Sequence, residues 1–139
     1  MTLPPKDAAR RFYARLEEAL RTGDVDVLDE VTALDAVDHQ PDPGMKPGRA
    51  GIKEAFAGMC LAFSDVRFVV EDLVAEGDKV ACRITTRATH RGPFLGFPAT
   101  GRVVSYCVLD ILRFSSEGQL LERWGLVEEG VLRQQLAGQ

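Results

Sequence analysis

The sequence predicts an α+β fold in which helices pack on one face of an antiparallel sheet. Apolar residues follow a helical period in the first part of the chain, up to Phe63, and most of Val66 to Val127 reads as strands. Two of the three strand connections are short turns, which join antiparallel neighbours. Helices first and a meander of strands afterwards are typical of α+β domains and not of doubly wound parallel folds.

Four helical segments are expected. From Lys6 to Thr22 apolar residues recur every three or four positions, Gly23 ends this stretch, and Asp24 can cap a short second helix. The same period returns from Gly51 to Phe63. A last short helix is expected from Gly130 to Ala137.

Four long strands are expected in the second part of the chain. Their predicted ranges are Val66 to Glu76, Lys79 to Thr89, Val103 to Phe114, and Gln119 to Val127. Between the first helices and these strands, residues 35–47 contain three prolines and predict a strand fragment followed by an irregular loop.

Composition limits the possible functions. The 139 residues, 45% of them hydrophobic and 27% charged, suit one globular domain over residues 1–139 with room for a core and a cavity. The net charge of −4, with scattered arginines, makes nucleic acid an unexpected partner. No stretch is apolar enough for a membrane span or a secretory signal, so a cytoplasmic location is expected.

Neither a metal nor a cofactor is expected. Cys60, Cys82 and Cys107 are odd in number and lie among apolar neighbours, which favours buried thiols, although one could pair with a histidine as a nucleophile. The two histidines and the scattered acids show no metal-ligand spacing. The glycines of residues 92–101 lie between strands and do not open a helix, as a phosphate-binding loop requires.

Alternation assigns residues to the faces of the sheet. In the strand after Gly77, the set from Val80 to His90 at every second position is expected to face inward. In the final strand Glu122, Trp124 and Glu128 share a face if no bulge intervenes. Because an unpaired buried carboxylate is costly, this mixture favours a pocket lining; the alternative is a solvent-facing surface with Trp124 exposed or at an interface.

Three stretches together resemble a known family. They are Val37–His39, the run from Gly77 that includes Thr89-His-Arg-Gly-Pro-Phe-Leu-Gly-Phe-Pro-Ala-Thr-Gly101, and Glu122–Trp124 followed by Gln135-Leu136. In order and spacing they are similar to the SnoaL-like polyketide and ester cyclases. The resemblance implies a fold like that of nuclear transport factor 2, a cone in which a curved sheet wraps around helices and encloses a pocket.

The resemblance also implies chemistry. Relatives close a polyketide ester by an intramolecular aldol reaction without metal or cofactor, which requires a base near an acidic carbon and donors near the carbonyl oxygen. The family's base is an aspartate four residues after the tryptophan, and Glu128 stands at that position. Arg123 stands where many relatives have histidine. Scaffold alone does not decide the reaction.

The predicted site combines these arguments. Glu128 is the candidate base and His90 the candidate electrophilic partner. The candidate substrate-binding residues are His39, Trp124, Phe94, Phe97, Tyr106 and Glu122. Several have structural alternatives: Glu128 could cap the last helix, Glu129 could replace it after a bulge, and either histidine could simply complete local hydrogen bonding. Asp110, in mid-strand, is expected to pair with Arg83 or Arg123.

The leading function is therefore a cofactor-free cyclase, lyase or isomerase that acts on a small carbonyl compound through carboxylate acid/base chemistry. The alternatives are a non-catalytic small-molecule-binding module and a protein-interaction domain. A homodimer is expected, through an outer sheet face with Val69, Leu73, Val104 and Val108.

Overall fold

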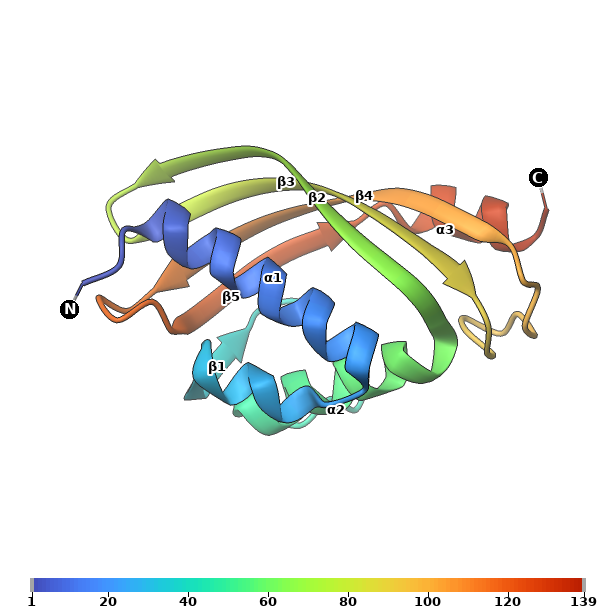
Figure 1. Cartoon of the computed structure of the whole chain (residues 1–139), viewed down its shortest axis with the longest axis horizontal. Helices are drawn as coiled ribbons and strands as arrows, with labels where there is room; N and C mark the ends of the chain where they lie inside the picture. Colours follow the sequence, from blue (N-terminus) through green and yellow to red (C-terminus); the bar gives the residue numbers. More distant parts are fainter. Residues whose placement is uncertain (1, 139) are drawn as a thin grey trace.

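The computed structural model describes residues 2–138 and confirms the α+β class (Figure 1). In chain order the elements are α1 (Pro5–Thr22), the 3-10 helix η1 (Val25–Glu30), β1 (Thr32–Asp38), α2 (Gly48–Ala62), β2 (Phe63–Glu76), β3 (Lys79–His90), β4 (Val103–Phe114), β5 (Leu120–Val127) and α3 (Glu129–Leu136). The predicted helices and the four long strands are present to within a few residues of their expected ends.

Local chemistry explains how α1 begins and ends. Pro5 occupies its first position, where the missing N–H costs no hydrogen bond. Gly23 ends the helix in the left-handed conformation, at φ 80°. The Asp24 side chain then accepts a hydrogen bond from Asp26 N at 3.0 Å and starts η1, as its position predicts.

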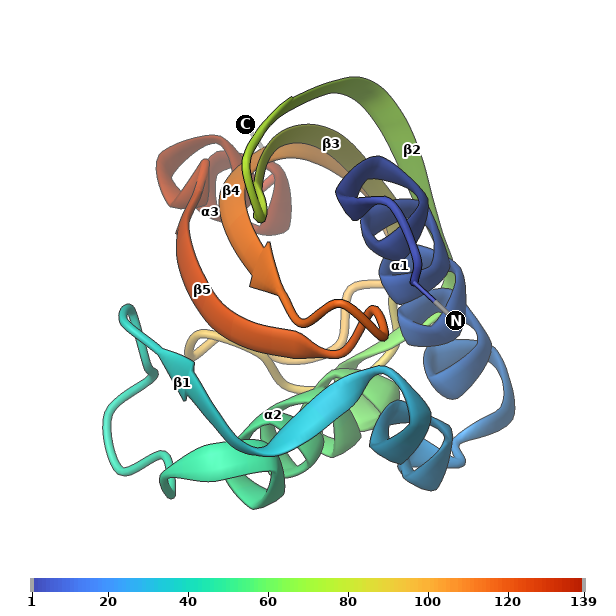
Figure 2. The same ribbon diagram turned by 90° about the vertical axis from the view of Figure 1, so that its left-hand side faces the viewer.

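The five strands form one sheet in the order β1-β5-β4-β3-β2. The last four are antiparallel neighbours, as expected, whereas β1 pairs in parallel with β5, which the sequence did not reveal. Viewed along its length, the sheet curves around an interior that α1 and α2 close from the other side (Figure 2). We call this concave side the inner face and the convex side the outer face.

The core has two parts along the inner face. One part joins α1 and η1 to the inner side chains of β3 and β4, including Val80, Ile84 and Leu112. The other part lies under α3 and the β3–β4 connection and includes Phe63 and Val104. The every-second-residue set of β3, from Val80 to His90, is buried as predicted.

Helix α3 covers the edge of β4 that β5 leaves free. The Gln135 side chain accepts from Ser105 N and donates to Ser105 O, both at 2.7 Å, and so replaces a neighbouring strand.

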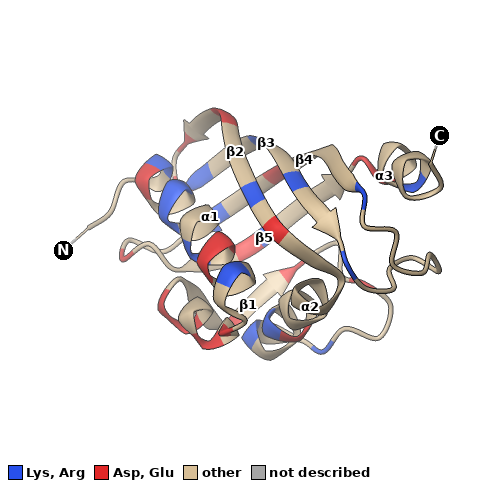
Figure 3. Cartoon of the chain, turned by 45° about the vertical axis from the view of Figure 1, so that its right-hand side comes forward, with Lys and Arg blue, Asp and Glu red and all other residues tan. Residues whose placement is uncertain are grey.

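The surface of α1 carries both basic and acidic residues along its length (Figure 3). No helix within residues 2–138 is long and apolar enough to cross a membrane, and the cytoplasmic location stays a prediction.

Candidate functional site

A chain of hydrogen bonds links four polar side chains on the inner face. The Tyr13 hydroxyl donates to Asp110 Oδ2 at 2.5 Å, and Arg123 Nε donates to Asp110 Oδ1 at 3.1 Å; Arg123 Nη2 lies 3.1 Å from the same oxygen in an ion pair. Arg123 Nη1 also donates to both oxygens of Asp38, at 3.1 and 3.2 Å. We call Tyr13, Asp38, Asp110 and Arg123 the inner polar chain.

Four different elements supply this chain. Tyr13 comes from the buried face of α1, Asp110 from β4, Arg123 from β5 and Asp38 from the end of β1. Asp110 pairs across the sheet with inward-facing Cys82, and Arg123 pairs with inward-facing Leu112, so both point inward. Of the two partners expected for Asp110, the structure brings Arg123 to it, whereas Arg83 pairs with Asp72.

Burial sets the electrostatics of the inner polar chain. Tyr13 and Asp110 are 4% and 7% exposed, whereas the side chains of Asp38 and Arg123 are 12% and 21% exposed. Burial raises the pKa of Asp110, and the nearby Arg123 charge opposes that rise. Burial and the Asp110 charge raise the pKa of Tyr13 strongly. The chain therefore has a dry end at Tyr13 and a more accessible end at Asp38.

Gly125 makes room for this arrangement. A Cβ added there would overlap Asp110 Oδ1 and Arg123 Nη2, so a larger residue would collide with the pair. The Gly125 N–H donates to Gln40 Oε1 at 2.7 Å. Strand β5 therefore contributes both the Arg123 charge and, at Gly125, the space that this side chain and Asp110 occupy.

The predicted substrate-binding residues of β5 lie on the outer face, so the inward reading of that strand was wrong. Glu122 pairs across the sheet with Arg113, and Trp124 with Ile111, which is 44% exposed. Glu122 Oε2 accepts from Arg113 Nε at 2.6 Å. The alternative that the sequence left open, an outward-facing Trp124, agrees with the structure.

His39 joins this outer group. Its ring stacks on Trp124 with centroids 4.5 Å apart and planes 5° from parallel, and its Nε2 lies 3.4 Å from Glu122 Oε1. Lys79 Nζ lies 5.2 Å from the centroid of the Trp124 ring. Hydrogen bonds from Arg113 and His39 lower the pKa of Glu122.

Glu128 is not in an apolar pocket, so the premise of a desolvated base at this position was wrong. It is exposed, precedes α3 as its N-cap residue, and accepts from Cys107 N at 3.2 Å. Its neighbour Glu129 is also exposed, and Glu129 Oε2 lies 3.6 Å from Arg133 Nε. Glu129 lies in the first turn of α3, whereas Glu128 precedes the helix and its side chain makes no capping hydrogen bond, so the capping role that the sequence allowed for Glu128 is not seen.

His90 is the last residue of β3 and is fully buried, and it lies far from Glu128. Its Nδ1 accepts from the backbone N–H of Thr100 at 3.3 Å and lies 2.9 Å from Thr100 Oγ1, while its buried Nε2 has no partner among residues 2–138. Glu128 joins the sheet opposite Cys107, which pairs with Thr85. Five residues of strand, roughly 16 Å, separate Thr85 from His90, so the structure does not bring the two predicted catalytic groups together.

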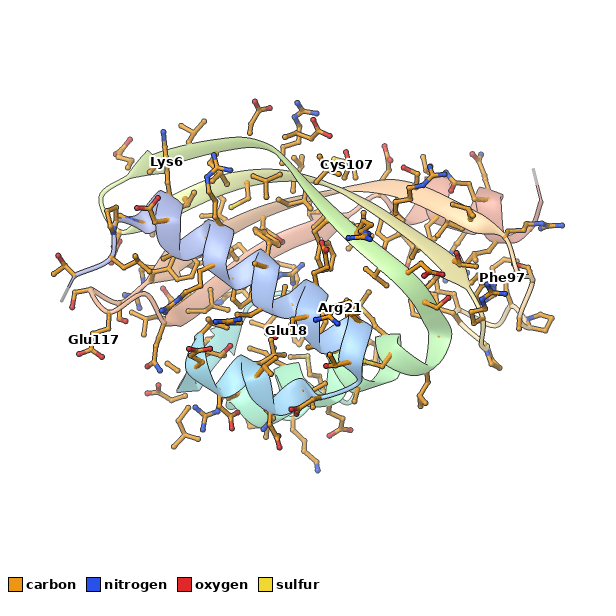
Figure 4. The ribbon with its side chains drawn as sticks, viewed as in Figure 1. Lys6, Glu18, Arg21, Phe97, Cys107 and Glu117 are labelled. Atoms are coloured by element: carbon orange, nitrogen blue, oxygen red, sulfur yellow. The ribbon has the colours of Figure 1, made fainter. Side chains whose placement is uncertain are left out.

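The remaining aromatic candidates gather at the α3 end of the molecule. Phe94 and Phe97 pair in a tight turn in the β3–β4 connection, and Phe94 contacts Phe63 edge-on with centroids 4.9 Å apart. Figure 4 labels Phe97 at this end and Glu117 at the opposite end. Tyr106 faces inward and is 7% exposed. These rings pack against the second part of the core.

Two hollows stand out on the surface. One, of about 370 Å³, lies between α1 and β2; Tyr13, Phe68 and Val70 are among its lining residues. The other, of about 450 Å³, lies beside Leu3, Phe114 and Leu121. Both are open grooves. Tyr13, at the dry end of the inner polar chain, is the link between the first groove and that chain.

The cysteines are free thiols, of which Cys82 is buried and Cys60 and Cys107 are half-buried. Burial raises the pKa of Cys82, which lies beside Tyr13, to about 12. Within residues 2–138, no three His, Cys, Asp or Glu side chains gather in an arrangement that could hold a metal ion.

Sequence reasoning missed Tyr13, Asp38 and Arg123 as members of one site. Tyr13 was read as part of an apolar helical stripe, and Arg123 as a departure from a family pattern. One signal was available: a mid-strand aspartate requires a partner, and that requirement pointed to Arg83 or Arg123 without deciding between them. Nothing local in the sequence predicted the parallel pairing that brings Asp38 to β5.

Comparison with known proteins gives consistent matches over nearly the whole chain. A family model described as SnoaL-like polyketide cyclase matches residues 10–136. IdmH from Streptomyces antibioticus, provisionally described as a polyketide cyclase, is 33% identical, with coverage of 97% of this chain and 99% of that chain and a TM-score of 0.78. TsrD from Streptomyces laurentii is 27% identical, with coverage of 95% and 96% and a TM-score of 0.82.

A further neighbour differs in its described activity. AclR from Streptomyces galilaeus, provisionally described as a hydroxylase, is 28% identical, with coverage of 94% of this chain and 81% of that chain and a TM-score of 0.75. Comparison with curated protein sequences finds no significant match. The assignment of chemistry to this chain therefore depends on its own side chains.

Proposed function

The chain belongs to the SnoaL-like polyketide cyclase family, and from this premise we propose that it catalyses a cofactor-independent proton-transfer reaction, such as cyclisation or isomerisation, on a small polyketide-like carbonyl compound. The proposed site is the inner polar chain. The observation that carries the proposal is that the hydrogen bonds of this chain are continuous. They connect a buried phenol to a buried carboxylate, that carboxylate to a guanidinium, and the guanidinium to a second, more accessible carboxylate.

Asp38 is the proposed base because of its accessible position. Its Oδ1 accepts from Arg123 Nη1 and from Gln40 N at 3.0 Å, whereas Oδ2 has Arg123 as its partner among residues 2–138. Oδ2 therefore retains a lone pair for a substrate proton. Both oxygens of Asp110, in contrast, are engaged by Tyr13 and Arg123.

The reaction then needs no external reagent. Asp38 removes a proton from the carbon beside a carbonyl group, and the electron pair of that C–H bond forms an enolate whose oxygen is stabilised by the Arg123 guanidinium. In a cyclisation, the enolate carbon attacks a second carbonyl group, and the resulting alkoxide recovers the proton from Asp38. Asp110 and Tyr13 hold the guanidinium in place and keep its charge partly desolvated.

Deuterium exchange tests this proposal without knowledge of the natural substrate. The protein is incubated in D2O with 2-tetralone, an aryl-fused ketone, and incorporation at the carbon beside the carbonyl is followed by proton NMR. Asp38→Asn should lower the protein-dependent rate at least about 100-fold, the scale expected for loss of a general base. The matched control is Glu122→Gln, which alters a carboxylate on the other face of β5 and should leave the rate within about twofold.

Two results would reject the proposed site. One is an Asp38→Asn protein that exchanges as fast as the unaltered protein. The other is a large loss in Glu128→Gln, which would return the reaction to the position that the family pattern indicates. If ketones bind and no exchange exceeds the buffer rate, the alternative of a non-catalytic binding module replaces the enzyme.

We also propose a homodimer, formed through the outer face. Leu109 and Leu126 are direct cross-strand partners, 54% and 71% exposed, beside the pair of Ile111 and Trp124. Such a contiguous apolar block is typical of an interface. Of the residues expected on this surface only Val69 lies there, because Val104 is buried and Leu73 and Val108 pack against the inner core.

Sedimentation tests the dimer directly. The unaltered protein should sediment as a dimer at micromolar concentration, and Leu109→Lys should sediment as a monomer because a charge is placed in the apolar block. A monomer in the unaltered protein would overturn this part of the proposal.

A further inference from the structure

The end of β1 alternates between the two faces of β5. Asp38 turns inward to Arg123, and the next residue, His39, turns outward to stack on Trp124. The partners are also adjacent on β5, because Arg123 and Trp124 are consecutive. The inner ion pair and the outer stack are therefore one residue apart on both strands.

Backbone contacts tie these two pairs together. His39 N donates to Arg123 O at 2.8 Å, directly between the ion pair and the stack. After Gln40 the chain leaves the sheet through the loop of residues 41–47, which contains three prolines. Asp38 is thus the last residue of β1, an edge strand of the sheet. The ends of edge strands fray more readily than the rest of a sheet.

We propose that the stack of His39 on Trp124 holds Asp38 in register with Arg123, so that His39 and Trp124 are positioning residues for proton transfer on the opposite face of the sheet. This inference rests on the proposed function of Asp38. Its physical basis is that a base displaced by about 1 Å loses much of its effectiveness.

The outer group is built to hold the His39 ring. The ring lies flat on Trp124, and its Nε2 lies 3.4 Å from Glu122 Oε1. The other oxygen of that carboxylate, Oε2, accepts a hydrogen bond from Arg113 Nε at 2.6 Å. The His39 side chain is nevertheless 36% exposed, so its removal leaves no buried cavity. A loss of activity on its removal would therefore report position and not general unfolding.

Substitution of His39 separates the stack from its hydrogen bond. His39→Ser removes the ring, whereas His39→Phe keeps a flat ring and loses the contact with Glu122. In the ketone exchange assay, His39→Ser should lower kcat about five- to tenfold, the scale of a lost aromatic contact, with KM within about twofold. His39→Phe should restore most of kcat. The matched control is Leu34→Ser, an exposed residue of the same strand, which should change neither constant.

A double substitution shows whether His39 acts through Asp38. In an Asp38→Asn background, His39→Ser should cause no further loss of the residual rate, because no carboxylate remains to be positioned. A further five- to tenfold loss in that background would overturn the inference, as would a His39→Phe protein no more active than His39→Ser. If Asp38→Asn alone has no effect, the proposed function has failed, which is a distinguishable result.

A measurement independent of activity completes the test. The Arg123 Nη1–H protons donate to Asp38, so their rate of exchange with solvent depends on how firmly this ion pair is closed, and arginine side-chain NMR follows that rate. Exchange should be faster in His39→Ser and unchanged in His39→Phe. Equal exchange rates in the unaltered protein and His39→Ser would contradict the positioning role even if every variant folds.

Discussion

The two faces of β5 carry similar charged groups in opposite environments. On the inner face, Arg123 lies between two carboxylates, Asp110 and Asp38. On the outer face, the carboxylate Glu122 lies between two basic groups, Arg113 and His39. The inner group is mostly buried and the outer group is partly exposed.

This difference shows that burial, more than composition, separates a candidate reaction site from a surface ion pair. Burial raises the pKa of Asp110 despite its cationic neighbour, whereas hydrogen bonding lowers the pKa of Glu122. A buried charge is costly when it loses its partner, and an exposed charge regains water. The two faces should therefore respond differently to the same kind of substitution.

The largest expected contrast comes from removal of each arginine. Arg123→Met should lower the free energy of unfolding by about 3 kcal/mol, because it leaves Asp110 and Asp38 facing each other without a counter-charge. Arg113→Met should cost much less, because Glu122 is partly exposed and regains water when its partner is removed. Urea denaturation of both variants measures the difference. Equal losses would show that the inner face is as well solvated as the outer face.

Gly125 provides the next contrast. Gly125→Ala should destabilise the protein by about 1 to 3 kcal/mol, because the added methyl group would overlap Asp110 and Arg123. Gly130→Ala is the control: a Cβ there meets nothing within 4 Å, and alanine is the better helix former in α3. Thermal unfolding should rank Gly125→Ala well below the unaltered protein and Gly130→Ala at or slightly above it. The reverse order would contradict the packing described for the inner face.

The two carboxylates should respond to pH in opposite directions. The folded-state pKa of Asp110 is raised above its ordinary 3.8, so its contribution to stability is full below that value and is lost as the pH rises through the raised pKa. The folded-state pKa of Glu122 is lowered below its ordinary 4.5, so its contribution is present above that value and is lost as the pH falls.

Stability curves of Asp110→Asn and Glu122→Gln across the acid range measure these contributions. The stability difference between the unaltered protein and Asp110→Asn should shift against the unaltered protein as the pH rises from about 4. The stability difference between the unaltered protein and Glu122→Gln should shift in favour of the unaltered protein over the same rise in pH. Parallel pH dependences would remove the distinction between the faces.

The smallest effect is expected at Glu128. Glu128→Gln keeps a carbonyl oxygen that can accept from Cys107 N, and the side chain is exposed. Its free energy of unfolding should change by less than about 0.5 kcal/mol, as for most surface substitutions, and ketone exchange should stay within about twofold. A large loss of exchange with unchanged stability would move the proposed reaction away from the inner face.

Periodicity predicted the elements of the fold well because each depends on its own residues. The stripe of α1 and the alternation of β3 appear in the structure with the buried sides that their patterns indicated. Turn residues such as Gly77, at φ 61°, separated the strands correctly.

The site was less predictable because it depends on relations between elements. Alternation correctly grouped Glu122 with Trp124, but it could not decide which side of β5 faces inward, and here that side carries Arg123. The register of β5 against β4 shifts between Arg113 and Phe114, so Leu120 is buried while Glu122 is not. The pairing of β1 with β5 joins residues 85 positions apart, and no local pattern encodes it.

Binding of an enolate analogue tests the central claim most directly. The phenol 2-naphthol, whose ionised form resembles an aryl enolate, is added to protein with 15N-labelled arginines, and Arg→Lys variants assign the Nε–H signals. The Arg123 signal should shift on binding, and the Arg113 signal on the opposite face of β5 should not. A shift of Arg113 alone, or saturable binding that leaves Arg123 unchanged, would contradict a reaction site on the inner face.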